Sequence, residues 1–340
     1  MIRRASHILP FLLLAGGLHA QNVLINAAGA TFPYPMYSKW FDDYHKKFPT
    51  LQFNYQSIGS GGGIRQVTEG TVDFGASDGP MDDKQMADFR AKRGGGILHF
   101  PTVMGADVPV YNLPGVTQQL NFTPEALAGI FLGKITKWND PELARANSGV
   151  NLPAKDIIVV HRSDGSGTTY IWTDYLSKVS KEWETKAGRG TSVNWPVGLG
   201  GKGNEGVSGQ VKQIPNSMGY VELIYAVQNK IAYGKVKNSA GVFVEASLAS
   251  VTAAAASSKE MPDDFRVSIT NAPGKDAYPI SSFTWLLIPE KISDATKKKA
   301  IKDFLTWMLA DGQKMAAALS YAELPKAVLA KEQKALARIQ

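Results

Sequence analysis

The chain has 340 residues, with 37 lysines and arginines against 30 aspartates and glutamates, and it contains no cysteine. The length predicts about two domains, and a composition of 44% hydrophobic and 20% charged residues is typical of a folded globular protein. The lack of cysteine excludes disulfide frameworks, thiolate-ligated metal centres, a thiol nucleophile and a lipid anchor on an N-terminal cysteine. The formal charge of +7 indicates an anionic partner without choosing between nucleic acid, membrane and small anion.

Residues 1–20 have the layout of a secretory signal peptide. Arg3 and Arg4 precede an apolar run over 8–15, no acidic residue occurs in this segment, and Ala20 offers a small residue for cleavage. The apolar run is too short to span a bilayer. We therefore expect cleavage after Ala20 and a soluble, exported protein, and the loss of two arginines lowers its formal charge from +7 to +5.

Strands alternate with helices along most of the chain, which predicts an α/β fold. Over the first hundred residues, strands are expected at 24–28, 51–55 and 72–76 and helices at 37–48, 62–70 and 84–92. The aromatic residues of the first helix recur at helical spacing, so we assign them to core packing. The apolar run 97–113 carries Pro101 and Pro109, and we expect it to form two strands that meet at a bend.

In the second part of the chain, Thr123 predicts the N-cap of a helix that has Pro124 at its first position. The fully apolar run 157–160 is typical of a strand in a parallel sheet that is covered on both faces. Further elements are expected as helices at 168–178, before 213 and from 222, a strand at 218–221, an alanine-rich surface helix within 246–258, a strand at 283–288, and helices near 301–308 and over the last 20 residues.

No disordered linker separates two domains, so short crossings must join them. The extended runs 97–113 and 278–289 are the candidates for these crossings. Two crossings would make the first domain discontinuous, built from both ends of the chain.

Three segments share one pattern, in which a strand is followed by glycine with serine or threonine and then by a helix: 29–32, 59–63 and 161–169. A helix N-terminus binds anions through its unpaired N–H groups, glycine lets the backbone approach the ligand, and a hydroxyl adds a donor. The guanidinium group of Arg162 can donate two parallel N–H hydrogen bonds to an oxyanion, and an ion pair with Asp164 can fix the orientation of this group. The spacing alone equally allows an Arg162–Asp164 surface ion pair worth at most about 1 kcal/mol.

Asp78 lies at the end of a strand, in the segment 76–79. A carboxylate repels a fully ionised anion such as sulfate, but it accepts a hydrogen bond from an anion that still carries a proton, as phosphate does near neutral pH. Asp78 therefore predicts a site that selects phosphate over sulfate. The alternative is an ordinary turn or N-cap aspartate.

Other motifs favour no catalytic or cofactor site. Residues 198–203 match GxGxxG, but Trp195-Pro196 stands where a dinucleotide-binding fold needs a strand, so we expect a flexible glycine loop at the rim of a cleft. No lysine precedes Thr168, which excludes a P-loop. His161 ends an apolar strand and is interpreted as structural instead of as a phosphatase nucleophile. The histidines are too scattered for a metal cluster, and we expect no cofactor.

Segments in order along the chain resemble the PstS family, the phosphate-binding proteins of bacterial high-affinity phosphate ABC transporters. They are 28–33 (Ala-Gly-Ala-Thr-Phe-Pro), 58–63 (Ile-Gly-Ser-Gly-Gly-Gly), 73–78 (Asp-Phe-Gly-Ala-Ser-Asp), 132–135 (Leu-Gly-Lys-Ile), 138–140 (Trp-Asn-Asp), 164–168 (Asp-Gly-Ser-Gly-Thr), 195–204 (Trp-Pro-Val-Gly-Leu-Gly-Gly-Lys-Gly-Asn) and 219–222 (Gly-Tyr-Val-Glu). The resemblance implies an α/β, periplasmic binding protein-like fold of type II, with a ligand cleft between two lobes. We expect lobe I to comprise 21–104 plus 281–340 and lobe II to comprise 105–280.

The resemblance also implies a set of phosphate contacts, made by Thr31, Phe32 through its backbone amide, Ser60, Asp78, Arg162, Ser166, Gly167 and Thr168, with Asp164 supporting Arg162. Gly61 stands where some relatives have a second serine, and His161 replaces a basic residue of some relatives. Both departures leave the contact set unchanged.

The function expected is capture of inorganic phosphate and its delivery to the membrane permease subunits of a phosphate ABC transporter. The protein is expected to be a monomer in the periplasm, without enzymatic activity. The alternatives are a secreted phosphatase on the same scaffold, which would turn over phosphate esters, and a binding protein for another oxyanion. Nucleic-acid binding is not expected, because the basic residues are dispersed.

Overall fold

The structure is a computed structural model that describes residues 22–258 and 260–340, so the expected signal peptide and its cleavage site lie outside the described residues. The strands are β1 (Val23–Gly29), β2 (Leu51–Ser57), β3 (Phe74–Ser77), β4 (Ile97–Asn112), β5 (Asn121–Phe122), β6 (Ile158–Arg162), β7 (Leu199–Gly201), β8 (Ser217–Glu222), β9 (Ala232–Tyr233), β10 (Lys235–Lys237), β11 (Phe243–Val244) and β12 (Ser281–Pro289). The α-helices are α1 (Tyr34–Lys47), α2 (Ser60–Glu69), α3 (Asp83–Arg93), α4 (Pro124–Phe131), α5 (Pro141–Ala146), α6 (Gly167–Val179), α7 (Lys181–Lys186), α8 (Gly203–Gln213), α9 (Leu223–Asn229), α10 (Leu248–Ser257), α11 (Ala295–Trp307) and α12 (Lys326–Ala335). Short π and 3₁₀ turns follow α11 and α12, at Met308–Gly312, Gln313–Met315, Ala317–Leu319 and Leu336–Arg338.

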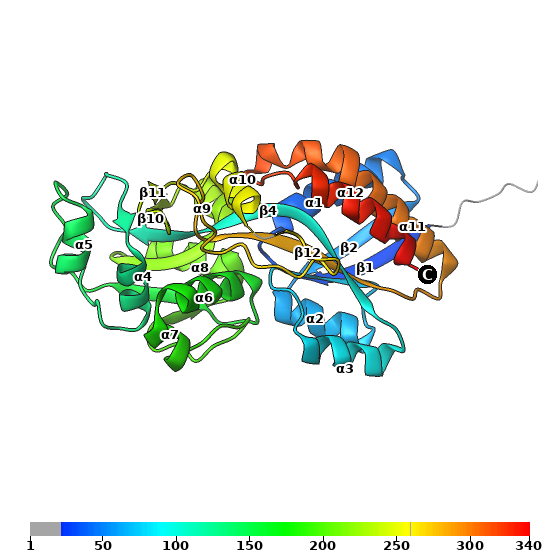
Figure 1. Ribbon diagram of the computed structural model, residues 1–340, viewed down its shortest axis with the longest axis horizontal. Helices are drawn as coiled ribbons and strands as arrows, with labels where there is room; N and C mark the ends of the chain where they lie inside the picture. Colours follow the sequence, from blue (N-terminus) through cyan, green and yellow to red (C-terminus); the bar gives the residue numbers. More distant parts are fainter. Residues whose placement is uncertain (1–21, 259) are drawn as a thin grey trace, which may run out of the picture.

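One curled sheet runs through the molecule in the order β2–β1–β3–β12–β4–β8–β6–β7, and β9 also pairs with β4. The strands at each end are parallel, whereas β12 and β4 in the middle are antiparallel to their neighbours. We call the part around β1, β2 and β3 lobe I and the part around β6, β7 and β8 lobe II. Figure 1 shows β4 passing from one lobe into the other. The expected α/β fold with two lobes is confirmed.

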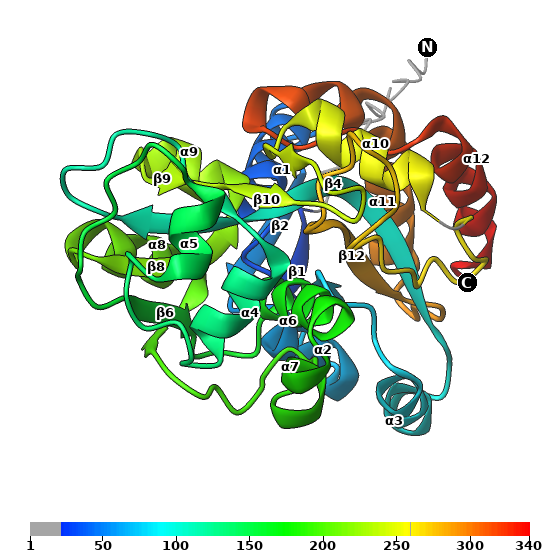
Figure 2. The same cartoon turned by 60° about the vertical axis from the view of Figure 1, so that its left-hand side comes forward.

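Helices cover both faces of the sheet in lobe I, with α1, α11 and α12 on one face and α2 and α3 on the other (Figures 1 and 2). The aromatic stripe of α1 packs into this core, as predicted: Tyr37 and Trp40 are fully buried, and the Phe41 ring lies 5.2 Å from the Phe304 ring of α11. No helix in the described part of the chain is long and apolar enough to cross a bilayer.

The run 97–113 forms one continuous strand, so the prediction of two strands at a bend was wrong. β4 pairs with β12 from Ile97 to Ala106 and then with β8 from Asp107 to Asn112. Near Pro101 the pairing register with β12 shifts, and such a bulge lets the strand include a residue without an N–H group. The lobes are therefore joined through a shared strand.

The glycine-rich stretch 198–209 is ordered secondary structure, and the prediction of a flexible loop over 198–203 was wrong. It forms β7 and the first two turns of α8. Gly203 begins α8 with a φ of 71°, and a Cβ on Gly201 would collide with the backbone of Gly206. These glycines therefore let the start of α8 approach both its own strand and lobe I.

Candidate anion-binding site

Six segment ends meet where the two lobes face each other. Lobe I contributes the end of β1, the N-terminus of α2 and the end of β3, and lobe II contributes the end of β6 and the N-termini of α6 and α8. The carboxyl ends of parallel strands lie at one edge of a sheet, which is why these distant sequence segments converge. The predicted site residues at these positions are all buried or partly buried: Thr31, Phe32, Ser60, Asp78, Arg162, Asp164, Ser166, Gly167 and Thr168.

Asn204, in the first turn of α8, ties the two lobes together. Its side-chain NH₂ donates to the hydroxyl of Thr31 in lobe I at 2.8 Å and to the hydroxyl of Thr168 in lobe II at 3.0 Å. Its side-chain oxygen accepts the backbone N–H of Glu222 at 3.0 Å. The lobes are thus in direct contact across the candidate site.

Glycines allow the helix N-termini to approach each other. The N–H of Gly61 in α2 donates to the carbonyl of Gly165 at 2.9 Å. A Cβ on Gly167, the first residue of α6, would collide with the Asp78 carboxyl and with the Ser60 hydroxyl. Both lobe I side chains therefore lie directly against the positive end of the α6 helix dipole.

Three hydroxyl groups of the site accept hydrogen bonds from the protein through their oxygens, which leaves their own hydrogens to be donated to a ligand. Thr31 and Thr168 accept from Asn204, and Thr168 also accepts from Arg162 Nη1 at 3.2 Å. Ser166 caps α6 by accepting a backbone N–H at 3.0 Å. An oxygen that accepts such bonds can still donate its own hydrogen. The three groups are therefore set to donate to an anion.

Arg162 and Asp164 form a buried pair, so the alternative of a surface ion pair was wrong. Nε donates to Oδ1 at 2.7 Å and Nη2 to Oδ2 at 2.5 Å, and the Arg162 side chain is 1% exposed. Burial raises the pKa of Asp164, but Arg162 and the N–H of Gly203 outweigh this effect, and the net pKa is lowered. The two charges cancel, and the fork is fixed in orientation.

Asp78 is a fully buried carboxyl group, not a turn or N-cap residue. The Thr284 hydroxyl of β12 donates to its Oδ1 at 2.7 Å, and Ser60 Oγ accepts its backbone N–H at 3.2 Å and lies 3.4 Å from Oδ2. Burial raises the pKa of Asp78 to about 7, against the opposing effects of Thr284, Arg162 and Ser60. Near neutral pH this group can therefore share a proton with a ligand.

Sequence reasoning missed four residues that support the site. Besides Asn204 and Thr284, the Tyr225 hydroxyl donates to the Thr31 carbonyl and the Tyr321 hydroxyl to the Phe32 carbonyl, each at 2.6 Å. Asn204 stands in a quoted family motif, and a threonine inside the apolar run 283–288 is a visible signal. The two tyrosines give no local signal, because their partners lie 194 and 289 residues away.

His161 lies beside the site in a structural role. Its ring stacks on Trp195 at 4.7 Å, and burial lowers its pKa despite backbone hydrogen bonds that favour the charged form. In the described ranges, 22–258 and 260–340, no group of three or more histidine, aspartate or glutamate residues could hold a metal ion.

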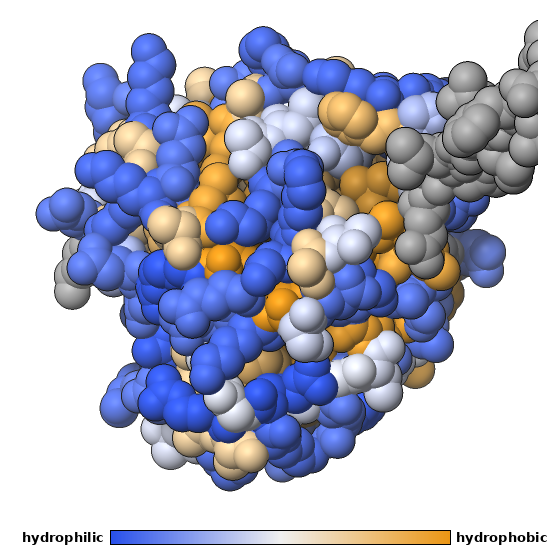
Figure 3. Space-filling model, turned by 90° about the vertical axis from the view of Figure 1, so that its right-hand side faces the viewer, coloured by the Kyte–Doolittle hydropathy of each residue, from blue (hydrophilic) through white to orange (hydrophobic). Residues whose placement is uncertain are grey.

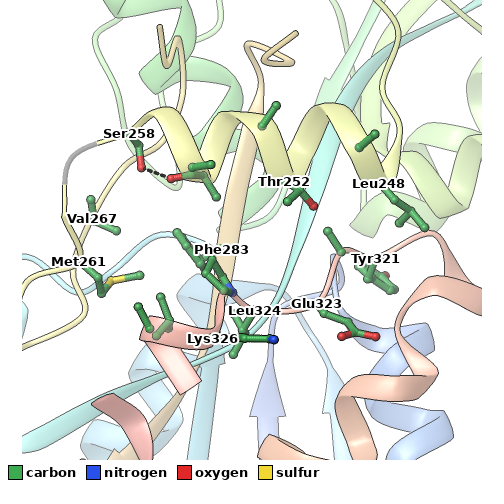
Figure 4. A pocket seen from close by; sticks show the side chains of 18 of the residues that line it. Leu248, Thr252, Ser258, Met261, Val267, Phe283, Tyr321, Glu323, Leu324 and Lys326 are labelled. Atoms are coloured by element: carbon green, nitrogen blue, oxygen red, sulfur yellow. Dashed lines mark hydrogen bonds between the residues drawn. The ribbon is translucent and has the colours of Figure 1, made fainter. Parts of the chain in front are cut away.

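A groove of about 1010 Å³ lies between α10 and the segment that leads into α12 (Figure 4), and its lining includes Tyr321 but none of the predicted phosphate contacts. Its lining is mainly apolar and includes Phe283, Leu324 and Val328, with Lys326 at its edge. Figure 3 shows another view of the surface, in which hydrophilic residues surround patches of apolar ones. An apolar lining suits no inorganic anion, so the groove is not the candidate site.

Comparisons with known proteins match the chain over most of its length. A family model described as a PBP superfamily domain matches residues 17–312. The chain is similar to "Phosphate-binding protein PstS" of Pasteurella multocida, with 47% identity over 98% of this chain and 95% of the relative. It is 41% identical to the protein of the same name from Methanocaldococcus jannaschii, over 86% of this chain and 80% of the relative.

Solved structures share the fold at lower identity. A putative phosphate ABC transporter substrate-binding protein with bound phosphate from Clostridium perfringens has a TM-score of 0.65 at 18% identity, covering 89% of this chain and 100% of that chain. A phosphate-binding protein from Stenotrophomonas maltophilia has a TM-score of 0.69 at 19% identity, covering 92% of this chain and 93% of that chain.

Proposed function

Because the chain belongs to the PstS family within the PBP superfamily, we propose that it captures inorganic phosphate between its lobes and delivers it to a phosphate ABC transporter. The contacts are made by Thr31, Phe32 through its amide, Ser60, Asp78, Arg162, Ser166, Gly167 and Thr168, and Asp164 holds Arg162 in place.

The observation that carries this proposal is the position of Asp78. Its carboxyl group lies against the N-terminus of α6, which favours an anion, and its own pKa is about 7. An oxyanion in this position meets hydroxyl donors, one arginine and one carboxyl oxygen. Phosphate can donate its proton to that oxygen, whereas sulfate would bring two unshared negative charges together.

We also propose that the two lobes close around the ligand by bending near the shared strand. Lobe I then comprises 21–104 plus 281–340, and lobe II comprises 105–280. The exchange of partners within β4, from β12 to β8 after Ala106, supports this division. Hinge closure is the ordinary motion of two-lobed binding proteins.

The remaining parts of the proposal concern where and with what the protein acts. We propose that it works in the periplasm after signal cleavage, as a monomer that meets the permease subunits directly and catalyses no reaction. Chromatography with light scattering measures its mass, and a chromogenic phosphate ester reveals any hydrolysis. Steady ester turnover would favour the secreted phosphatase.

The central test is the identity of the bound anion. Purified protein is denatured and its released anions are quantified by ion chromatography, and phosphate titrations are then run by calorimetry with and without a large excess of sulfate. We expect about one phosphate per chain and a phosphate affinity that sulfate leaves unchanged. Effective competition by sulfate would refute the role of Asp78, and a different co-purified anion would refute the function.

A further inference from the structure

Two acidic side chains lie behind the candidate site, at the point where β4 changes partners. Asp107 is the first β4 residue that pairs with β8, and its partner in the antiparallel register is Glu222. Both residues are fully buried. Directly opposed residues on antiparallel strands project to the same face, so the pair brings two acids together in the interior.

Most of the carboxyl oxygens of this pair have no partner. Within the described part of the chain, Oδ1 and Oδ2 of Asp107 and Oε1 of Glu222 are buried without a hydrogen bond. Glu222 Oε2 accepts the N–H of Ile224 at 2.8 Å and caps α9. The arginine that interacts with Asp107, Arg162, already binds Asp164 with two N–H groups. An unpaired carboxylate in such surroundings is costly, and the group keeps its proton instead.

Several of the groups that face the pair belong to the candidate site or support it. Asp107 interacts electrostatically with Asp78, Glu222 and Arg162, and with the phenols of Tyr220 and Tyr278.

Glu222 interacts with Asp78 and with the phenols of Tyr225 and Tyr321. Its backbone N–H binds Asn204, which bridges the two threonine hydroxyls of the site. A negative charge on either acid would therefore repel an anion bound at the candidate site.

We propose that Asp107 and Glu222 are a pair of neutral acids whose protons permit phosphate binding, and that their ionisation sets the alkaline limit of phosphate capture. This inference rests on the proposed function. The arginine of the site is neutralised by Asp164, so each proton lost from the pair adds an uncompensated negative charge behind the ligand.

The direction of the pH effect follows from the environment of the pair. Burial is the largest cause that raises the pKa of both acids well above their ordinary values, and repulsion by Asp78 adds to it in each. Glu222 raises the pKa of Asp107 further, whereas Arg162 opposes the rise for Asp107, and the N–H groups of Ile224 and Leu223 and the Tyr321 hydroxyl oppose it for Glu222. The acids are neutral below these raised pKa values, and phosphate binding is unimpeded there. As the pH rises through them, one and then two like charges appear and binding weakens.

The test compares native protein with the Asp107→Asn/Glu222→Gln variant, whose amides mimic the neutral acids in shape. The Kd for phosphate is measured by calorimetry from about pH 6 to about pH 10. At each pH both proteins meet the same phosphate species, so the ratio of their Kd values is independent of the titration of phosphate itself. We expect equal Kd values, within about threefold, at pH 6. Toward pH 10 the native Kd should increase about tenfold more than that of the variant.

Glu332 in α12 provides a matched control. It is also fully buried, both of its carboxyl oxygens lack a hydrogen-bond partner among the described residues, and burial alone raises its pKa. Glu332→Gln should change stability but leave the native pH profile of phosphate binding intact. A general effect of buried acids would instead shift the profile in both variants and would overturn the proposal.

Three outcomes are separated by this design. Absence of phosphate binding by native protein at every pH refutes the proposed function. Binding with parallel pH profiles in native and amide proteins refutes the acid pair. If the double variant does not fold, ¹³C NMR titration of the native carboxyl groups decides, because two ionised side chains at pH 7 would contradict the inference directly.

Discussion

The two lobes bring opposite chemistry to one site. Lobe II supplies a buried arginine, already paired with Asp164, and the N-terminus of α6, whereas lobe I supplies the buried carboxyl of Asp78, which among the described residues of that lobe contacts hydroxyl groups and no cation. The features of lobe II attract any oxyanion. The carboxyl of lobe I is favourable only to an anion that still carries a proton. Selectivity should therefore depend mainly on Asp78 of lobe I, whereas both lobes contribute to affinity, and substitutions can separate the two properties.

The largest expected effect is the loss of affinity when the cation of lobe II is removed. Arg162→Gln takes away the charge and leaves the partly buried Asp164 without its cation, so phosphate affinity should fall by roughly 10²- to 10³-fold. Calorimetry with phosphate measures the change. Arg189→Gln is the control, because Arg189 also pairs with a buried acid, Asp174, at 3.0 Å, and in the described part of the chain its ion pair and hydrogen bond go to that acid. Equal losses in the two variants would contradict the role of Arg162.

A smaller loss of affinity with a change in selectivity is expected from lobe I. Asp78→Asn keeps the shape of the side chain but removes the carboxylate that accepts a hydrogen bond from the protonated oxygen of phosphate. Phosphate binding should weaken by about tenfold to a hundredfold, while sulfate becomes a measurable competitor. Competition calorimetry with both anions measures this change. If Arg162→Gln altered the phosphate-to-sulfate ratio more than Asp78→Asn does, the division of labour between the lobes would be wrong.

The sequence predicted the parts of the site that depend on local pattern. Ser60, Asp78 and Arg162 each lie at a strand end or a helix start, and the parallel sheet brings such ends together whatever the distance along the chain. Asn204 and Tyr225 were missed because their contacts with Thr31 come from the approach of the lobes. Tyr321 was missed because its partner Phe32 lies 289 residues away within lobe I. β4 was divided wrongly because the prolines were interpreted locally, whereas a bulge beside Pro101 keeps the strand whole.

The two threonines that Asn204 bridges offer a balanced test between lobes. Thr31→Val and Thr168→Val each remove one hydroxyl donor with little change in shape, and each should weaken phosphate binding by about tenfold. Thr168→Ser should restore most of the loss, because the hydroxyl is retained. Fluorescence or calorimetric titration measures the three affinities. An unchanged affinity in Thr31→Val would show that the Thr31 hydroxyl makes no contact with phosphate, which leaves Asp78, Ser60 and the Phe32 amide as the contribution of lobe I.

The smallest effect is on stability and needs no ligand. The folded pKa of Asp78 is about 7, well above its ordinary value, so the folded protein holds a proton that the unfolded chain has lost. Native stability therefore falls as the pH rises from about 4 through 7, and Asp78→Asn escapes this loss. In phosphate-free protein, the difference in Tm between the variant and native protein should shift by roughly 3 °C in favour of the variant as the pH rises from 5 to 8.

Asp174 should change stability with pH in the direction opposite to that of Asp78. Burial raises its pKa, but Lys178 and the hydroxyls of Ser268 and Thr270 outweigh burial and lower it overall. Such a group stabilises the fold above its ordinary pKa and loses this contribution as the pH falls. Asp174→Asn should therefore be less stable than native protein at pH 8, with a deficit that shrinks toward acidic pH. Asp78 has hydroxyl partners but no paired cation in the described structure, and the proposed function assigns it to the anion, whereas Asp174 is paired with Lys178 and Arg189. Calorimetric melting of both variants across this pH range distinguishes an acid reserved for ligand from an acid that holds the fold.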